Sequence, residues 1–329
     1  MDQIEETRTM GWLRDLPDFR DYTIEQSEPP ARVNEPPDRA SVRAMLTEVG
    51  ALDTPLAALP PVVDLRPWMS PVEDQGAIGS CTANAGVGLI EYFERRAFGR
   101  HINASRLFLY KATRNLMHWT GDTGAYLRTT MGAMALFGVP PEEYHKYVVA
   151  DYDKEPSAFC YAFGQSFQSV QYFRLDPAGT PRDVLLNRIK TNIATGLPSM
   201  FGFTVYNSIN QANTTGAIPF PVGGESVLGG HAVVACGFDD SRVIRNTNAG
   251  GITTRGALLV RNSWGTGWGQ AGYGWLPYQF VLSGLAVDWW NLVKHEWVET
   301  GQFGVATTLS GMTAADGMAS MEYGVASRP

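Results

Sequence analysis

A cysteine, a histidine and an asparagine stand in contexts that suit thiol chemistry. Cys81 follows Gly79-Ser80 and opens a segment with helical spacing of apolar residues. A helix N-terminus favours the thiolate, because partial positive charge and unpaired N–H groups gather there. His231 opens a β-like run, and its imidazole would take up the thiol proton. Asn262 ends another apolar run, and its side-chain amide would hold the imidazole ring. The pattern predicts nucleophilic acyl transfer.

The same region supplies donors for a tetrahedral intermediate. Such an intermediate needs hydrogen bonds to its oxyanion, and the Cys81 backbone N–H and the Gln75 side-chain amide would provide them. Gly76 and Gly79 allow the backbone to turn sharply and to approach a substrate closely. All the parts of an acyl-transfer site are therefore present, in three separate segments.

These segments resemble the papain family of cysteine peptidases. The chain reads QGAIGSC at 75–81, GGH at 229–231 and NSWGTGWG at 262–269, which is the family's order of motifs. The resemblance spans about residues 62–280. It implies that Cys81 is the nucleophile, His231 the base and acid, Asn262 the group that orients His231, and Gln75 the oxyanion donor. It also implies thioester chemistry without a cofactor or a metal.

The resemblance extends to residues that would bind substrate. The stretch Gly121–Gly124 is similar to the family's glycine-rich wall, which hydrogen-bonds extended substrate, and Trp264 would shield the His–Asn hydrogen bond. Gly202 and Ala232 fall at the family's apolar pocket; both are small, so we expect a roomy pocket that accepts Leu, Phe or Tyr. The implied substrate-binding set is Thr123, Gly124, Gly202, Ala232, Trp264 and Trp268.

The sequence also departs from the family pattern. Ile78 stands where the family usually has a disulfide cysteine, and Thr82 where it has tryptophan. We therefore expect no native disulfide. The spacing from Cys81 to Asn262 is longer than usual, and the glycines and polar residues of 240–256 predict an elongated hairpin that accommodates the excess.

Hydrophobic periodicity predicts helices first and strands later. This order independently favours an α+β fold with a helical lobe, a β-rich lobe and the active-site cleft between them. The expected helices are a short one within 39–52, one that begins after Ser80 and ends at Gly99, and others at 105–114, 127–137 and 181–195; the expected strands are 199–205, 231–238, 257–262 and 273–276.

Composition narrows the range of partners. The net charge of −7 and the lack of a basic stripe argue against nucleic acid, and no apolar run is long enough to span a membrane. Three of the first six residues are acidic, unlike the basic start of a secretory signal. We expect a monomer that acts on peptides or proteins, either in the cytoplasm or exported without a recognisable signal peptide. The three cysteines match neither a disulfide framework nor a zinc site.

Three parts are expected along the chain. Residues 62–300 form the catalytic domain, with the helical lobe over about 70–160 and the β lobe over about 161–300, and 301–329 form a mobile tail. Residues 1–61 carry twelve acidic residues against six arginines and cannot fold alone. They hold a cluster that we expect to be buried, either in the cleft, where it would inhibit, or as a structural strap on one lobe: Trp12, Leu13, Leu16, Phe19 and Tyr22.

The combined prediction is a cysteine endopeptidase with a Cys-His-Asn site. One alternative keeps the residues but changes the reaction to acyl transfer, deamidation or deconjugation. Another is a catalytically silent binding protein with a blocked cleft.

Overall fold

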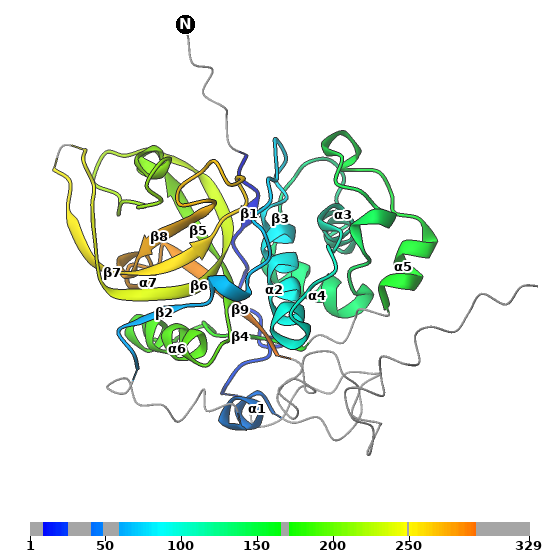
Figure 1. Ribbon diagram of the computed structural model, residues 1–329, viewed down its shortest axis with the longest axis horizontal. Helices are drawn as coiled ribbons and strands as arrows, with labels where there is room; N and C mark the ends of the chain where they lie inside the picture. The colour runs from blue at the N-terminus through cyan, green and yellow to red at the C-terminus, as the bar shows by residue number, and fades with distance from the viewer. Residues whose placement is uncertain (1–8, 26–40, 49–58, 166–170, 249, 294–329) are drawn as a thin grey trace, which may run out of the picture.

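A computed structural model describes residues 9–25, 41–48, 59–165, 171–248 and 250–293. A helical lobe and a lobe built on the main sheet lie side by side, with β1 (Trp12–Leu13) between them (Figure 1). The α+β, two-lobed prediction is confirmed. The predicted tail at 301–329 and much of 1–61 lie outside the described residues.

The central helix of the first lobe is α2, Cys81–Phe98. Every residue from Cys81 to Phe93 is buried, as expected for a helix that is apolar nearly all round. The helix ends at Gly99, which adopts the left-handed conformation with φ +70° and donates its N–H to the Arg95 carbonyl. Cys81 is thus the first residue of a rigid, fully packed element.

The other expected helices also form. In α3, Arg106–Leu116, the Ser105 hydroxyl caps the N-terminus by accepting from the Phe108 N–H. The rest are α4 (Leu127–Phe137), α6 (Arg182–Ala194) and α1 (Val42–Glu48), the last within the predicted range 39–52; α5 (Ala158–Gly164) and α7 (Tyr278–Leu282) were not predicted. Among the described residues, no helix is long and apolar enough to cross a membrane.

The second lobe is built on an antiparallel sheet with strand order β4-β9-β5-β6-β7-β8 and with β2 paired to β6. The bounds are β2 Val62–Asp64, β4 Gln171–Arg174, β5 Ser199–Tyr206, β6 Val227–Arg245, β7 Thr253–Arg261, β8 Tyr273–Pro277 and β9 Ala286–Val293. The predicted elongated hairpin is present, because β6 and β7 stay paired as far as Arg245 and Thr253.

Residues 9–25, which we call the covering segment, join the two lobes. Its strand β1, Trp12–Leu13, pairs in parallel with β3, Ala125–Tyr126, and further along Thr23 forms a bridge to β4. β1 also lies against β6 (Figure 1). The segment therefore contributes to both lobes although it precedes them in the sequence.

The prediction that the apolar cluster of residues 12–22 is buried is only partly correct. Trp12 and Tyr22 are buried, but Leu16 and Phe19 are 77% and 92% exposed. Between them the chain turns at Asp18, whose carboxylate pairs with Arg20. The turn directs the two apolar side chains outward, while acidic side chains of the segment enter the protein.

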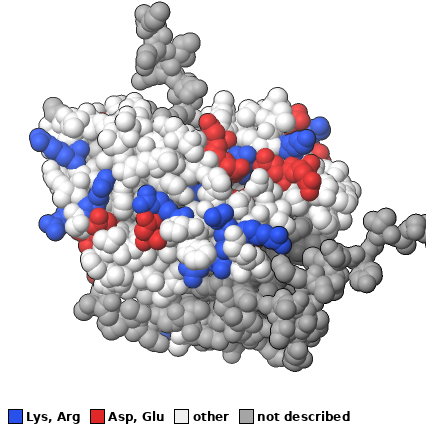
Figure 2. All heavy atoms as spheres, in the orientation of Figure 1, with Lys and Arg blue, Asp and Glu red and all other residues white. Residues whose placement is uncertain are grey.

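Charged side chains of the described residues are dispersed over the face shown in Figure 2. On the face shown in Figure 2, Lys and Arg side chains lie in separate groups, several of them beside acidic side chains. This face carries no continuous basic stripe.

Candidate active site

Cys81 lies at the N-terminus of α2 and is completely buried. Burial raises the pKa of its thiol to about 11, and hydrogen bonds from the backbone of Ala232 and Gly11 oppose that effect. One of these contacts comes from the strand that carries His231, and the other from the covering segment. The raised pKa disfavours the thiolate, which was the form expected from the sequence. The reason is that the thiol is completely buried.

His231 and Asn262 are joined directly. The His231 Nε2 lies 2.8 Å from the Asn262 Oδ1, and the Ser263 N–H donates to the same oxygen at 2.8 Å. His231 is on β6 and Asn262 directly follows β7, and these strands are neighbours. Since this bond occupies Nε2, proton exchange with a thiol would use Nδ1. The sheet thus places the imidazole and its predicted orienting amide together.

Two tryptophans cover this pair. The Trp264 ring stacks on His231 with centroids 4.5 Å apart and an interplanar angle of 22°. The Trp268 ring meets Trp264 edge-on at 5.4 Å and 88°. Both are buried, so the His–Asn bond lies under an apolar cover. Trp268 supports Trp264 from behind.

Gln75 is held at a defined orientation on the other side of the site. Its Oε1 accepts from the Ser263 hydroxyl at 2.6 Å, and its Nε2 donates to the Ile78 carbonyl at 2.9 Å and to the Thr9 carbonyl at 3.1 Å. The amide therefore already donates to a main-chain carbonyl from another part of the chain. Such an interaction is what an oxyanion donor must make. Ser263, which the sequence analysis did not single out, fixes that orientation.

The covering segment passes over these residues. Gly11 approaches the turn before Cys81 so closely that a Cβ on Gly11 would lie 1.9 Å from the Gly79 carbonyl oxygen. A Cβ on Gly124 would lie 2.3 Å from the Gly11 oxygen. Thr123 donates its hydroxyl to the Gly124 carbonyl at 3.2 Å. The expected substrate wall is therefore in contact with the segment's backbone.

The Trp12 side chain fills the expected apolar pocket. A Cβ added at Gly202 would lie 1.9 Å from the indole ring, and one at Gly230 would lie 2.6 Å from it. The absence of side chains at these two positions makes room for the ring. Sequence analysis identified Gly202 and Ala232 but missed Gly230, although Gly230 directly precedes His231.

Behind β1 the covering segment is anchored through Asp15. The Asp15 N–H donates to the Asp288 carboxylate at 2.7 Å, and the Asp15 carboxylate accepts from Trp290 Nε1 and from the Arg128 N–H, each at 3.1 Å. Asp15 and Asp288 are both buried. Residues from the two ends of the described chain therefore form one polar cluster.

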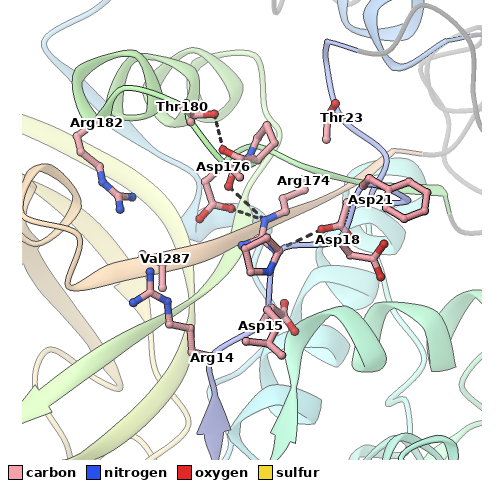
Figure 3. A pocket seen from close by; sticks show the side chains of 16 residues that line it. Arg14, Asp15, Asp18, Asp21, Thr23, Arg174, Asp176, Thr180, Arg182 and Val287 are labelled. Atoms are coloured by element: carbon pink, nitrogen blue, oxygen red, sulfur yellow. Dashed lines mark hydrogen bonds and ion pairs between the residues drawn. The ribbon is translucent and has the colours of Figure 1, made fainter.

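Two arginines neutralise part of this cluster. Arg128 pairs with Asp21 at 2.5 Å, and Arg174 pairs with Asp288 at 2.7 Å and with Asp176 at 3.0 Å. Burial raises the pKa of Asp288 and of Asp15, and the arginines only partly offset this effect. Figure 3 shows Asp15 and Asp21 of the segment together with Arg174 and Asp176, beside a hollow of about 820 Å³.

No sequence signal identified this cluster, because its members lie in four distant segments. Among the described residues, no group of three or more His, Cys, Asp or Glu side chains could hold a metal ion. The three cysteines are free and buried.

Comparison with known proteins assigns most of the chain to one family. Residues 59–281 match the model of the papain family of cysteine proteases. An uncharacterised peptidase C1-like protein of Acanthamoeba polyphaga mimivirus is 30% identical over 296 residues, which cover 88% of each chain. Chicken cathepsin K (Gallus gallus) is 26% identical over 222 residues, 65% of this chain and 58% of its own.

Solved structures show the same fold. Xylellain, a cysteine protease from Xylella fastidiosa, superposes with a TM-score of 0.66 at 30% identity, over 89% of this chain and 99% of its own. Bromelain from Ananas comosus, solved with the inhibitor E64, gives a TM-score of 0.53 at 19% identity, over 72% of this chain and 100% of its own. The chain belongs to the papain family of cysteine proteases, which are hydrolases.

Proposed function

We propose that this chain is an endopeptidase that cleaves peptide bonds with Cys81 as nucleophile. The Cys81 Sγ attacks the scissile carbonyl carbon while the thiol proton passes to His231. The amine then leaves with that proton, and a thioester remains on Cys81. Water, deprotonated by His231, hydrolyses the thioester and restores the thiol.

The observation that carries this proposal is the His231–Asn262 hydrogen bond together with a buried cysteine at a helix N-terminus, whose sulfur is hydrogen-bonded to the backbone of Ala232, the residue after His231. Asn262 fixes the ring, and the α2 N-terminus favours negative charge on the sulfur. Gln75 supports the proposal from a different direction, since its amide already donates to a backbone carbonyl. A merely structural cysteine would need none of these partners.

An epoxide inhibitor of cysteine proteases tests the assignment. We expect the label on Cys81 after peptide mapping, and we expect Cys81→Ala to abolish both labelling and peptide turnover. His231→Ala should slow both reactions. Rapid labelling of Cys160 or Cys236, with Cys81→Ala still active, would overturn the assignment.

The covering segment, in this proposal, keeps the enzyme latent. It buries Cys81, engages the Gln75 amide through the Thr9 carbonyl and fills the apolar pocket with Trp12. A substrate therefore cannot reach the thiol until the segment leaves. The blocked cleft also fits a catalytically silent binding protein, which would remain unlabelled and inactive even when the segment is displaced.

The occupied pocket indicates the substrate side chain. Space beside Gly202 and Gly230 that holds an indole ring also holds Phe, Tyr or Leu, and desolvating such a side chain contributes ~1.5–3 kcal/mol. A peptide library should therefore show preference for these residues two positions before the cut. Strong preference for Asp or Lys there would contradict this pocket assignment.

Product analysis in the presence of an added amine separates hydrolysis from acyl transfer.

A further inference from the structure

Asp122 links two parts of the site that must keep a fixed spacing. Its Oδ1 accepts from the Gly79 N–H at 2.9 Å, in the turn that leads into Cys81. The same oxygen accepts from the Tyr110 hydroxyl at 2.5 Å. One carboxylate oxygen thus joins the nucleophile's turn to helix α3.

Tyr110 continues this link to the edge that receives an extended strand. Its hydroxyl oxygen accepts from the Gly124 N–H at 3.1 Å. The neighbouring Ala125 N–H donates to the Gly11 carbonyl at 2.8 Å, so this edge binds backbone in the structure. A hydrogen-bonded path therefore runs from Gly79 through Asp122 and Tyr110 to Gly124.

The hydroxyl at the centre of this path is rigidly placed. Tyr110 is fully buried, and the Arg114 guanidinium lies 4.1 Å from the centre of its ring. Arg114, one helical turn further along α3, also donates to the Gly121 carbonyl. Burial raises the pKa of Tyr110 most, and the hydrogen bond to the Asp122 carboxylate raises it further. The hydroxyl therefore keeps the proton that it donates. Helix α3 consequently holds the loop 121–124 at both ends.

We infer that Tyr110 and Asp122 are a positioning pair that sets the distance between Cys81 and the backbone of a bound peptide. Neither residue is assigned a chemical step. Because thiol attack requires the reacting atoms at about 3–3.5 Å and well aligned, a small shift of either partner slows the reaction. This inference rests on the proposed peptidase function.

The chain offers a matched control in Tyr161. Its hydroxyl donates to the Glu155 carboxylate at 2.8 Å and accepts from the Asn115 side-chain N–H at 3.0 Å. The hydroxyl of Tyr161 therefore makes the same kinds of bond as that of Tyr110, but to neither the Cys81 turn nor the loop 121–124. Tyr161→Phe reports what the loss of such a hydroxyl does to stability alone.

The test compares two reactions of Cys81 in the full chain carrying Trp12→Ala, which opens the site. Iodoacetamide requires only a reactive thiol, whereas a fluorogenic peptide must also bind along the loop edge. We expect Tyr110→Phe to lower kcat/KM for the peptide about tenfold, mainly through KM, with a smaller change in the iodoacetamide rate. Asp122→Ala should slow both reactions. Asp122→Asn retains an acceptor oxygen for Gly79 and should restore most of the activity.

The outcomes separate this inference from the proposed function. A parent whose Cys81 is labelled but which turns over no peptide would refute the proposed function itself. An active parent in which Tyr110→Phe and Asp122→Ala match Tyr161→Phe would refute the positioning pair. Equal losses with peptide and iodoacetamide in Tyr110→Phe would also overturn it, because the link to the substrate edge would then have no separate effect. If Asp122→Ala does not fold, Tyr110→Phe and Asp122→Asn still decide the matter.

Discussion

Replacing Trp12 with alanine should open the active site. The indole is buried beside Gly202 and Gly230, and neither glycine has a side chain to fill the space that it leaves. Removing a buried Trp side chain costs about 3–5 kcal/mol in comparable cores. We call the protein docked when the covering segment lies over the site, and undocked when it does not. If the lost free energy destabilises only the docked state, about 3 kcal/mol raises the undocked population roughly 100-fold.

Alkylation of Cys81 measures this population. When docking and undocking are faster than alkylation, the observed rate is proportional to the fraction of molecules in which the thiol is accessible. We therefore expect Trp12→Ala to speed epoxide labelling and peptide turnover by about two orders of magnitude. Adding a peptide of residues 9–24 should return both rates toward those of the wild type.

Two further variants sharpen this experiment. Phe19→Ala changes an aromatic residue of the same segment that is 92% exposed, and it should leave the labelling rate unchanged. Gly11→Ala removes no contact, but its new methyl group would meet the Gly79 carbonyl oxygen at 1.9 Å, so it should also accelerate labelling. Folded Trp12→Ala and Gly11→Ala proteins that label at the wild-type rate would show that the segment does not control access.

Three other predictions follow from the site and its cover. Gln75→Ala should lower kcat by ~10²–10³ in the opened enzyme, as loss of a main oxyanion donor does, and a decrease below threefold would remove Gln75 from that role. Alkylation in denaturant without reductant should modify all three thiols, whereas a stable deficit of two would reveal a disulfide. Burial raises the pKa of Asp15 and of Asp288, so these carboxyls hold protons in the docked state above the pH at which they would lose them in water. Docking of the covering segment should therefore be strongest in acid and should weaken as the pH rises above about 4, the ordinary aspartate pKa. The weakening is measured as faster Cys81 labelling relative to the Trp12→Ala variant. Slower labelling at higher pH would contradict the role of the Asp15–Asp288 cluster.

The proposed active site could be located from the sequence because each of its parts has a local signal. The glycines before Cys81 and His231 and the Asn-Ser-Trp run at 262–264 can be recognised without knowing what they contact. Helices α2, α3 and α4 followed from apolar spacing and from their caps. Strand β9 was missed, since its run of mostly apolar residues contains the buried Asp288, which pairs with Arg174.

The cover was harder to predict because it depends on contacts between distant segments. Sequence composition indicated that Trp12 needs burial, but it gave the same expectation for Phe19, which is exposed. The difference is set by the turn at Asp18 and by the partners of Asp15, which come from β9 and α4. Neither partner lies within 100 residues of Asp15, so no local pattern could reveal it.

In the proposed latent enzyme, the same cover would control both access to the thiol and its reactivity. In the docked state, burial raises the Cys81 pKa to about 11, which disfavours the thiolate at neutral pH. When the segment leaves, water returns to the sulfur, while the α2 N-terminus and His231 remain in place. These groups then favour the thiolate without competition from desolvation. A single displacement therefore supplies the substrate path and the nucleophile together, and any variant that exposes Cys81 by this route should also make its alkylation faster at neutral pH.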